Sequence, residues 1–370
     1  MQANPFAIAG MVIIGALTFL LGYFSSRGAD ATPDFLAARR MVRSRRNAAA
    51  ISGEYLSAAS FLGIAGLVLK DGISALWYPI GFATGYLALL LFIAAPLRRS
   101  GAYTVPDFAE ARLGSASLRR LCTICVLLIG LLYLVPQLQG AGLTLSTVLP
   151  AAPVWLGGAV VTVLVVLNVA AGGMRAVTLV QAFQYWVKLF AIAAPTFVLF
   201  AVFLGGPYGI RSADQHTLSA PNPPVFSTAR RIDVRTPVEV EVQQPVQLRA
   251  SGLIDNFHTD GGVIWAPGIP HQLDAGTTLW FDKGSPVPVV MGAPSTNASW
   301  LNQPAGDTGA LIDDLSLLFA LIAGTMGLPH VLVRFYTNPD GRDARRTTLV
   351  VIVLLSSFYL LPTLFGAFGR

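Results

Sequence analysis

Long apolar segments alternate with short polar segments along the 370-residue chain. Eight of the apolar segments are long enough to cross a lipid bilayer as a helix, which takes about 20 residues. The pattern therefore predicts an all-α polytopic membrane protein. The eight predicted spans cover residues 5–24, 47–69, 74–96, 120–149, 154–171, 180–204, 311–333 and 346–368.

Residues 205–310 follow a different pattern. They contain 12 of the chain's 24 prolines and no apolar run of 18 residues. The segment Val238–Leu248 alternates apolar and polar residues, which is typical of a half-buried strand. Thr277–Phe281 and Pro286–Val290 are further short strand candidates, separated by glycine and proline. We therefore predict an extracytoplasmic insertion with some β structure.

The basic residues predict which side of the membrane each loop faces. Sixteen arginines fall in segments that the predicted spans place on one side, whereas the short loops on the other side hold only Lys70. The positive-inside rule then places the arginine-rich loops in the cytoplasm and the N-terminus outside an inner (plasma) membrane. Arg334 is counted among the cytoplasmic loop residues. Lys188, near the inner end of the sixth span, is expected to snorkel to the interface.

Composition supports this class and excludes others. The charged fraction of 12% is about half of the roughly 25% found in soluble proteins. The net charge of +6 does not indicate nucleic-acid binding, because the arginines lie in short loops between apolar runs. His216, His258 and His271 match no zinc spacing, so no resident metal or cofactor is predicted. Only Glu54 and His330 could belong to a catalytic cluster within the spans, so we do not predict an enzyme.

The second span contains a carboxylate, Glu54, within the small-residue stretch Ser52–Gly66. An ionised side chain at membrane depth costs about 3 kcal/mol or more. The small residues fit two interpretations. They allow close packing of neighbouring helices, or they mark a helix that unwinds near the midplane, so that free carbonyls bind Na⁺ or half-helix ends bind a carboxylate. Glu54 favours the second interpretation, and the alternative for Glu54 is an acid that reaches the membrane interface.

The seventh span contains the stretch Ala323–Phe335, in which Pro329 and His330 interrupt an apolar run. Proline removes a backbone donor and clashes with the preceding turn, so a break is predicted near Gly324–Leu328. The alternative is a single proline kink, with His330 only hydrogen-bonded to a neighbouring helix. Two interrupted helices, one early in each half of the chain, indicate a transporter binding site.

Four stretches resemble the sodium/solute symporter family, and in particular its bacterial cation/acetate branch. The resemblance implies a leucine-transporter-like fold of two inverted five-helix repeats. An extra N-terminal span (1–25) would precede a first repeat at 47–204, and residues 311–370 would begin the second. The stretches are Ser52–Gly66, Ala102–Gly114, Gly172–Lys188 and Gly324–Thr337.

The same resemblance implies which residues bind the ion and the substrate. The broken second span would bind Na⁺ through backbone carbonyls, with the acidic position beside them. These cation-binding residues are Gly53, Glu54 and Leu56. The implied substrate-binding residues are Ser57, Ser60, Thr325, Met326 and Gly327. Gly63, Pro329 and His330 are assigned to the helix breaks and to gating.

The function implied by the resemblance is sodium-coupled uptake of a small, acetate-like monocarboxylate by alternating access. The expected partners are Na⁺, a small organic anion and the lipid bilayer. Alternatives are a symporter for pyruvate, propionate or an amino acid, and a membrane sensor domain. Members of the family continue beyond the eighth span, where further hydroxyl side chains complete the sodium site. Because this chain ends at Arg370, we expect that it does not transport by itself.

Overall fold

A computed structural model describes residues 5–26, 37–57, 59–149, 152–203, 225–294, 297–301 and 308–369. The chain divides into two compact units. The helical unit comprises Met1–Ala65, Trp77–Phe197 and Ile312–Leu364. The second unit comprises Gly66–Leu76, Val198–Leu311 and Phe365–Arg370. His216 lies outside the described residues.

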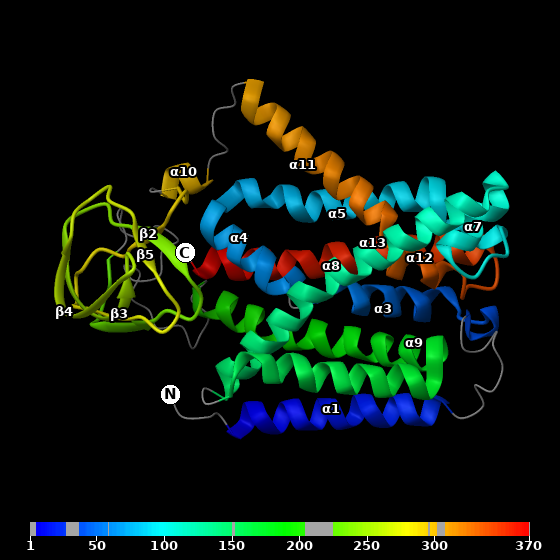
Figure 1. The fold of residues 1–370 in the computed structure, drawn as a ribbon, viewed down its shortest axis with the longest axis horizontal. Helices are drawn as coiled ribbons and strands as arrows, with labels where there is room; N and C mark the ends of the chain where they lie inside the picture. Colours follow the sequence, from blue (N-terminus) through cyan, green and yellow to red (C-terminus); the bar gives the residue numbers. More distant parts are fainter. Residues whose placement is uncertain are drawn as a thin grey trace. The chain divides into compact units, whose positions relative to one another are not determined.

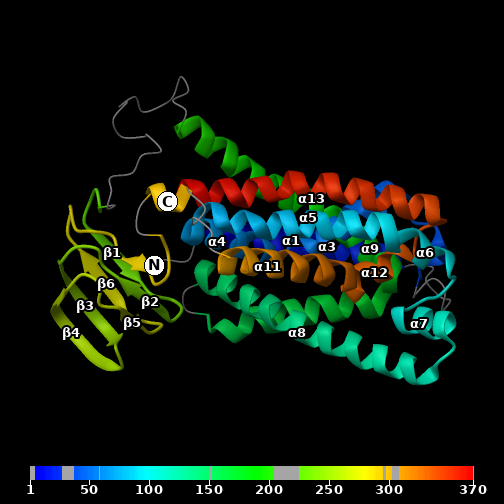
Figure 2. The ribbon, with the colours of Figure 1, turned by 90° about the horizontal axis from the view of Figure 1, so that it is seen from above.

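The helical unit is built from long helices, of which α1, α3 and α13 run in roughly the same direction in both views (Figures 1 and 2). Several of them continue into the second unit. The α-helices of the chain are α1 (Pro5–Ser26), α3 (Ser44–Tyr55), α4 (Ile64–Asp71), α5 (Trp77–Ala88), α6 (Ala94–Arg99), α7 (Val105–Leu113), α8 (Ala116–Val148), α9 (Val154–Phe203), α10 (Asn297–Leu301), α11 (Thr308–Gly327), α12 (Pro329–Phe335) and α13 (Gly341–Gly369). Shorter 3₁₀ or π turns are η1 (Ala38–Arg40), η2 (Ala59–Gly63), η3 (Gly72–Leu76) and η4 (Leu89–Ile93).

The helical class predicted from the sequence is confirmed. Among the described residues, six helices are long and apolar enough to cross a membrane, and Val154–Ala170 is a shorter apolar helix. One of the six, Ser60–Arg99, is 40 residues long and contains parts of two predicted spans. The protein is therefore an integral membrane protein, while the count of eight spans stays a prediction. The six helices are Pro5–Ser25, Ser60–Arg99, Ala116–Val148, Gly172–Ala201, Thr308–Gly327 and Gly341–Gly369.

A single glycine divides α9 into two helical arms. Gly173 has φ 52° and ψ −146°, a conformation that side chains with a Cβ rarely adopt. The chain reverses direction there, and the two arms run back along each other (Figure 1). This reversal corresponds to the boundary that the sequence predicts between the fifth and sixth spans. It also places Arg175 and Thr178 at the start of the second arm.

The second unit contains an antiparallel β-sheet with its own apolar core. The strand order is β1-β6-β3-β5-β2-β7, and β4 pairs with β3. The core consists of inward-facing residues such as Val242, Leu248, Ala250, Trp265 and Phe281. The strands are β1 (Arg230–Asp233), β2 (Val238–Glu241), β3 (Val246–Ile254), β4 (Phe257–Trp265), β5 (His271–Leu273), β6 (Thr278–Phe281) and β7 (Val289–Val290).

The alternating segment Val238–Leu248 is not one strand. It contributes β2 and the beginning of β3, with a turn before Pro245. Proline has no backbone N–H for a ladder hydrogen bond, which favours a strand boundary at this position. The alternation still places Val242, Val246 and Leu248 in the core. The strand candidates Thr277–Phe281 and Pro286–Val290 are confirmed as β6 and β7, each shorter than predicted.

Removing a core side chain from this sheet should destabilise it locally. Leu248 is 4% exposed, so we expect Leu248→Ala to cost about 2–5 kcal/mol through lost burial and the resulting cavity. Hydrogen exchange of the purified full chain should then show faster exchange in β3 and β6. The matched control is Ile264→Ala on β4, because Ile264 is 74% exposed and should change stability by less than about 0.5 kcal/mol. Equal exchange in both variants would contradict this core.

Candidate functional site

The first interruption in the helical unit follows α3. Leu56 leaves helical geometry with φ −75° and ψ 80°, and the π-helical turn Ala59–Gly63 follows. The break predicted in the second span is therefore confirmed. Gly63 ends this π turn, and a Cβ added there would meet nothing within 4 Å.

Ser57 and Ser60 stabilise the broken backbone. The backbone N–H of Ser57 donates to Ser60 Oγ at 2.8 Å, and the backbone N–H of Ser60 donates to Ser57 Oγ at 3.2 Å. Ser60 Oγ also lies 3.1 Å from the carbonyl oxygen of Tyr55. Gln137, from α8, donates its side-chain amide to Ser57 Oγ at 3.3 Å. In this structure the two hydroxyls therefore replace backbone hydrogen bonds that the helix break removes.

A lysine ammonium lies at the end of α3. Lys188 Nζ donates to the carbonyl oxygen of Gly53 at 2.7 Å. Gly53 is buried, and a Cβ there would collide with the backbone carbonyl of Gln181, so α3 and α9 are in close contact. The expectation that Lys188 snorkels to the interface is wrong, because a buried carbonyl binds its ammonium. The Lys188 ammonium is thus bound to the Gly53 carbonyl oxygen, which the family resemblance assigns to Na⁺.

Glu54 forms an ion pair with Arg334. Arg334 Nε lies 2.7 Å from Glu54 Oε2, and the exposed fractions of the two side chains are 2% and 23%. Arg334 Nη1 also donates to Thr178 Oγ1 at 2.9 Å. The expected placement of Arg334 in a cytoplasmic loop is wrong: it is a buried residue of α12. The pair explains how a carboxylate is accommodated within the helical unit.

Buried polar side chains hold the backbone around Arg334 in place. Asn47 Nδ2 donates to the carbonyl oxygen of Arg334 and to Asn338 Oδ1, both at 2.9 Å. Asn338 Nδ2 donates to the Val42 carbonyl at 3.1 Å, and Thr337 Oγ1 donates to the Arg334 carbonyl at 2.7 Å. Asn47, Thr337 and Asn338 are fully buried. This network joins the beginning of α3 to the segment between α12 and α13.

The partners in this network were not predicted from the sequence. Asn47 begins a predicted span and Asn338 lies in the loop between two predicted spans, where polar residues are ordinary. Two features of the sequence could have indicated the ion pair. Arg334 follows shortly after the predicted break in one span, and Glu54 is an acid without an obvious partner in another.

The second interruption separates α11 from α12. Leu328 has φ −63° and ψ 110°, and α12 begins at Pro329. The predicted break is therefore confirmed, at the last residue of the predicted range. The ring of His330 lies against Tyr133 with 4.7 Å between centroids. Met326 is half-buried and Gly327 is exposed.

Thr325 belongs to a buried group of polar and aromatic residues around Tyr55. The Tyr55 ring contacts those of Phe82, Tyr86 and Tyr359 at centroid distances of 5.7, 5.5 and 6.4 Å. The Tyr55 hydroxyl interacts with the side-chain hydroxyls of Thr325 and Tyr359. The Tyr86 hydroxyl makes no hydrogen bond with the described residues. A buried polar atom without a partner is uncommon and costly, so this oxygen is a candidate to face a bound polar group.

A small cavity of ≈ 180 Å³ opens beside the first break. Lys188 and Ser57 are its polar lining residues, and its other lining residues are apolar. No hydrogen bond among the described residues joins Ser57 or Ser60 to Thr325. The lining residues are Leu56, Ser57, Phe61, Lys188, Ile192 and Phe358.

No metal cluster competes with this site within the part of the chain that the structure describes, where no three His, Cys, Asp or Glu side chains are placed to hold an ion. His271 instead pairs with Asp255 at 2.8 Å. Burial opposes ionisation of Asp255, but hydrogen bonds from His271 and from the backbone N–H of Gln272 outweigh it and lower the pKa of the carboxyl.

Curated relatives are similar over almost the whole chain. An uncharacterized symporter, YwcA, of Bacillus subtilis is 28% identical over 97% of this chain and 54% of its own length. A monocarboxylic acid transporter of Corynebacterium glutamicum is 28% identical over 98% of this chain and 55% of its own length. The chain thus spans about half the length of these relatives.

Comparison with solved structures supports the fold. A structure described as the substrate-bound outward-open state of a Na⁺-coupled sialic acid symporter matches with a TM-score of 0.62 and 12% identity. The match covers 99% of this chain and 60% of the other. In sequence, the sodium:solute symporter family matches residues 35–245, which is more than half of the chain. Together with the two interrupted helices, these matches show that the chain belongs to the sodium:solute symporter family.

Proposed function

We propose that this chain contributes the substrate and ion site of a sodium-coupled carrier for a small, acetate-like monocarboxylate. The cavity of ≈ 180 Å³ beside the broken α3 is the observation that supports it most directly. An ammonium forms strong, charge-assisted hydrogen bonds with a carboxylate, and Ser57 adds a hydroxyl next to it. Phe61, Ile192 and Phe358 provide apolar walls for a short alkyl group. The name of the Corynebacterium relative agrees with this substrate class.

The contact between Lys188 and Gly53 suggests how the anion and Na⁺ are coupled. In the structure the ammonium donates to the Gly53 carbonyl oxygen. A bound carboxylate would attract the ammonium and free this oxygen for Na⁺, together with the carbonyl of Leu56. Each ligand would then raise the affinity for the other, as thermodynamic linkage requires.

The remaining site residues take supporting roles in this proposal. Ser60 and Thr325 are further candidates to bind substrate, with Met326 and Gly327 at the second break. Glu54 holds α12 through Arg334 and adds negative charge near the ion. Movement about the breaks at Gly63 and at Pro329–His330 would open the site to one side of the membrane at a time.

The wider organisation is part of the same proposal. Residues 47–204 would form the first inverted repeat, and 311–370 the beginning of the second. The arginine-rich loops would face the cytoplasm, and the β-containing insertion at 205–310 would face outside. Alternating access requires such a pair of repeats around a central site.

Binding of labelled acetate to the purified chain in lipid nanodiscs, with and without Na⁺, tests the proposal. Acetate should bind more tightly in Na⁺ than in choline. Lys188→Met should weaken acetate binding by about tenfold to a hundredfold, the expected loss of one charge-assisted hydrogen bond. Lys70→Met is the matched control, because Lys70 is paired with Asp71 and is not a lining residue of the cavity.

The outcomes separate the possible substrates. Displacement of acetate by propionate and pyruvate, but not by amino acids, would support a monocarboxylate site. Tighter Na⁺-dependent binding of an amino acid would contradict the substrate class. Acetate binding that is equal in Na⁺ and choline would contradict sodium coupling.

A further inference from the structure

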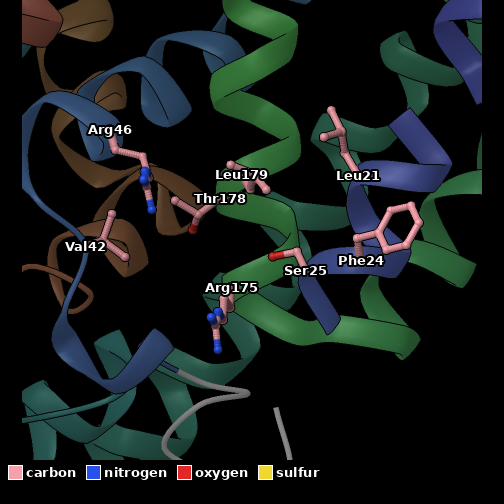
Figure 3. Close-up of a pocket in the computed structure, with 8 residues that line it drawn as sticks. All are labelled: Leu21, Phe24, Ser25, Val42, Arg46, Arg175, Thr178 and Leu179. Atoms are coloured by element: carbon pink, nitrogen blue, oxygen red, sulfur yellow. The ribbon is translucent and has the colours of Figure 1, made fainter. Parts of the chain in front are cut away.

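A second, larger cavity lies elsewhere in the helical unit. It has a volume of ≈ 350 Å³ and is formed by the end of α1, the beginning of α3 and the second arm of α9 (Figure 3). It is distinct from the proposed substrate site, since the two cavities share no lining residue. Its lining residues are Leu21, Phe24, Ser25, Val42, Arg46, Arg175, Thr178 and Leu179.

Among the described residues, the lining of the cavity includes two arginines and no acid. Neither Arg46 nor Arg175 forms an ion pair or a hydrogen bond with any residue that the structure describes, and the Ser25 hydroxyl is equally unpaired there. Figure 3 shows the Ser25 and Thr178 hydroxyl oxygens directed toward the middle of the group. Thr178 already donates to the Met174 carbonyl at 2.6 Å, so it forms a wall of the cavity. Two guanidinium groups and one hydroxyl thus remain as donors for an anion.

The beginning of α3 strengthens the attraction for an anion. This helix has no side-chain N-cap and no acidic residue in its first turn, where Arg46 lies instead. Helix N-termini carry free backbone N–H groups and a partial positive charge, so additional cations there are unfavourable. An anion in the cavity would interact favourably with the helix end and with both arginines.

The apolar side of the cavity indicates what the anion is attached to. Leu21 and Phe24 belong to the last turns of α1, which is one of the helices long and apolar enough to cross a membrane. Phe24 is 59% exposed and the adjacent Tyr23 is 48% exposed, as is typical of aromatic residues at a membrane interface. A soluble anion would gain no binding free energy from Leu21 and Phe24, whereas an acyl chain could pack against both side chains.

We propose that this cavity binds the phosphate of an anionic phospholipid, with Arg46 and Arg175 on the headgroup and Leu21 and Phe24 beside an acyl chain. Basic pockets between transmembrane helices bind acidic headgroups in this way. Thr178, in α9, also accepts a hydrogen bond from Arg334, so a bound lipid would contact a residue that is bonded to the Glu54–Arg334 pair. Lipid binding should therefore stabilise the helical unit.

Native mass spectrometry of the full chain can measure retention of phosphatidylglycerol against phosphatidylcholine. Each guanidinium should raise the affinity for phosphatidylglycerol about fivefold. The double variant Arg46→Gln with Arg175→Gln should therefore lower that affinity by about 25-fold. The control is Arg112→Gln with Arg120→Gln, which removes the same charge elsewhere. Arg46→Lys with Arg175→Lys keeps both charges and should retain most of the preference, which separates lost binding from misfolding.

Three results would overturn this inference. The first is an equal loss of phosphatidylglycerol in the control variant, which would indicate general surface charge. The second is equal retention of phosphatidylglycerol and phosphatidylcholine by the unaltered chain. The third is complete displacement of the lipid by inorganic phosphate at millimolar concentration, which would assign the cavity to a soluble anion. Thermal stabilisation by phosphatidylglycerol, lost only in the Arg46 and Arg175 double variant, would support the lipid site.

Discussion

Replacing Arg334 with methionine is expected to destabilise the helical unit by about 3–5 kcal/mol, the usual effect of leaving one charge of a buried ion pair without its partner. The Arg334 side chain is 2% exposed, and its Nε lies 2.7 Å from Glu54 Oε2. Methionine fills a similar volume but cannot neutralise the carboxylate. Thermal unfolding of the chain in nanodiscs, followed by tryptophan fluorescence, measures the loss.

The double variant tests the cause of that loss. Adding Glu54→Gln to Arg334→Met removes the unpaired charge, so the double variant should be more stable than Arg334→Met alone. A double-mutant cycle from the four proteins gives the interaction energy of the pair. If Arg334→Met is as stable as the unaltered chain, the ion pair does not stabilise the fold.

Replacing Gly53 with alanine is expected to separate α3 from α9. The added Cβ would collide with the Gln181 carbonyl and lie within 3.2 Å of Tyr185 Cβ. Overpacking of this kind costs about 1–3 kcal/mol. That exceeds the roughly 1 kcal/mol by which alanine favours a helix over glycine. The shift should also lengthen the contact between Lys188 and Gly53 and weaken acetate binding.

Gly130→Ala is the control for this substitution. Gly130 lies in α8, and a Cβ there would meet nothing within 4 Å, so alanine should leave stability unchanged or raise it. Thermal unfolding and acetate binding of both variants give the comparison. Similar stability of the Gly53→Ala and Gly130→Ala variants would contradict close packing of α3 on α9.

The sequence predicts local features of this molecule well. The runs of small residues around Glu54 and the proline after Leu328 locate both helix interruptions to within a few residues. The apolar runs identify the membrane-spanning class, and the alternation of Val238–Leu248 identifies residues that face a sheet core. These features follow from neighbouring residues, so they require no knowledge of tertiary contacts.

Long-range pairings could not be predicted in the same way. Arg334 and Glu54 are 280 positions apart, and neither local pattern indicates the other residue as its partner. Lys188 could equally reach the membrane surface, and only the close contact of α3 with α9 turns it toward Gly53. The strand break at Pro245 was missed because the alternation of apolar residues continues across it.

The lysine at Gly53 has a consequence for energy conservation in the proposed carrier. A tethered ammonium cannot diffuse away, so in the proposed carrier it would compete with Na⁺ for the Gly53 carbonyl oxygen. An ion arriving alone would have to displace it without the compensation that a carboxylate provides. Competition from the Lys188 ammonium would thereby reduce the leakage of Na⁺ down its gradient without cotransported substrate.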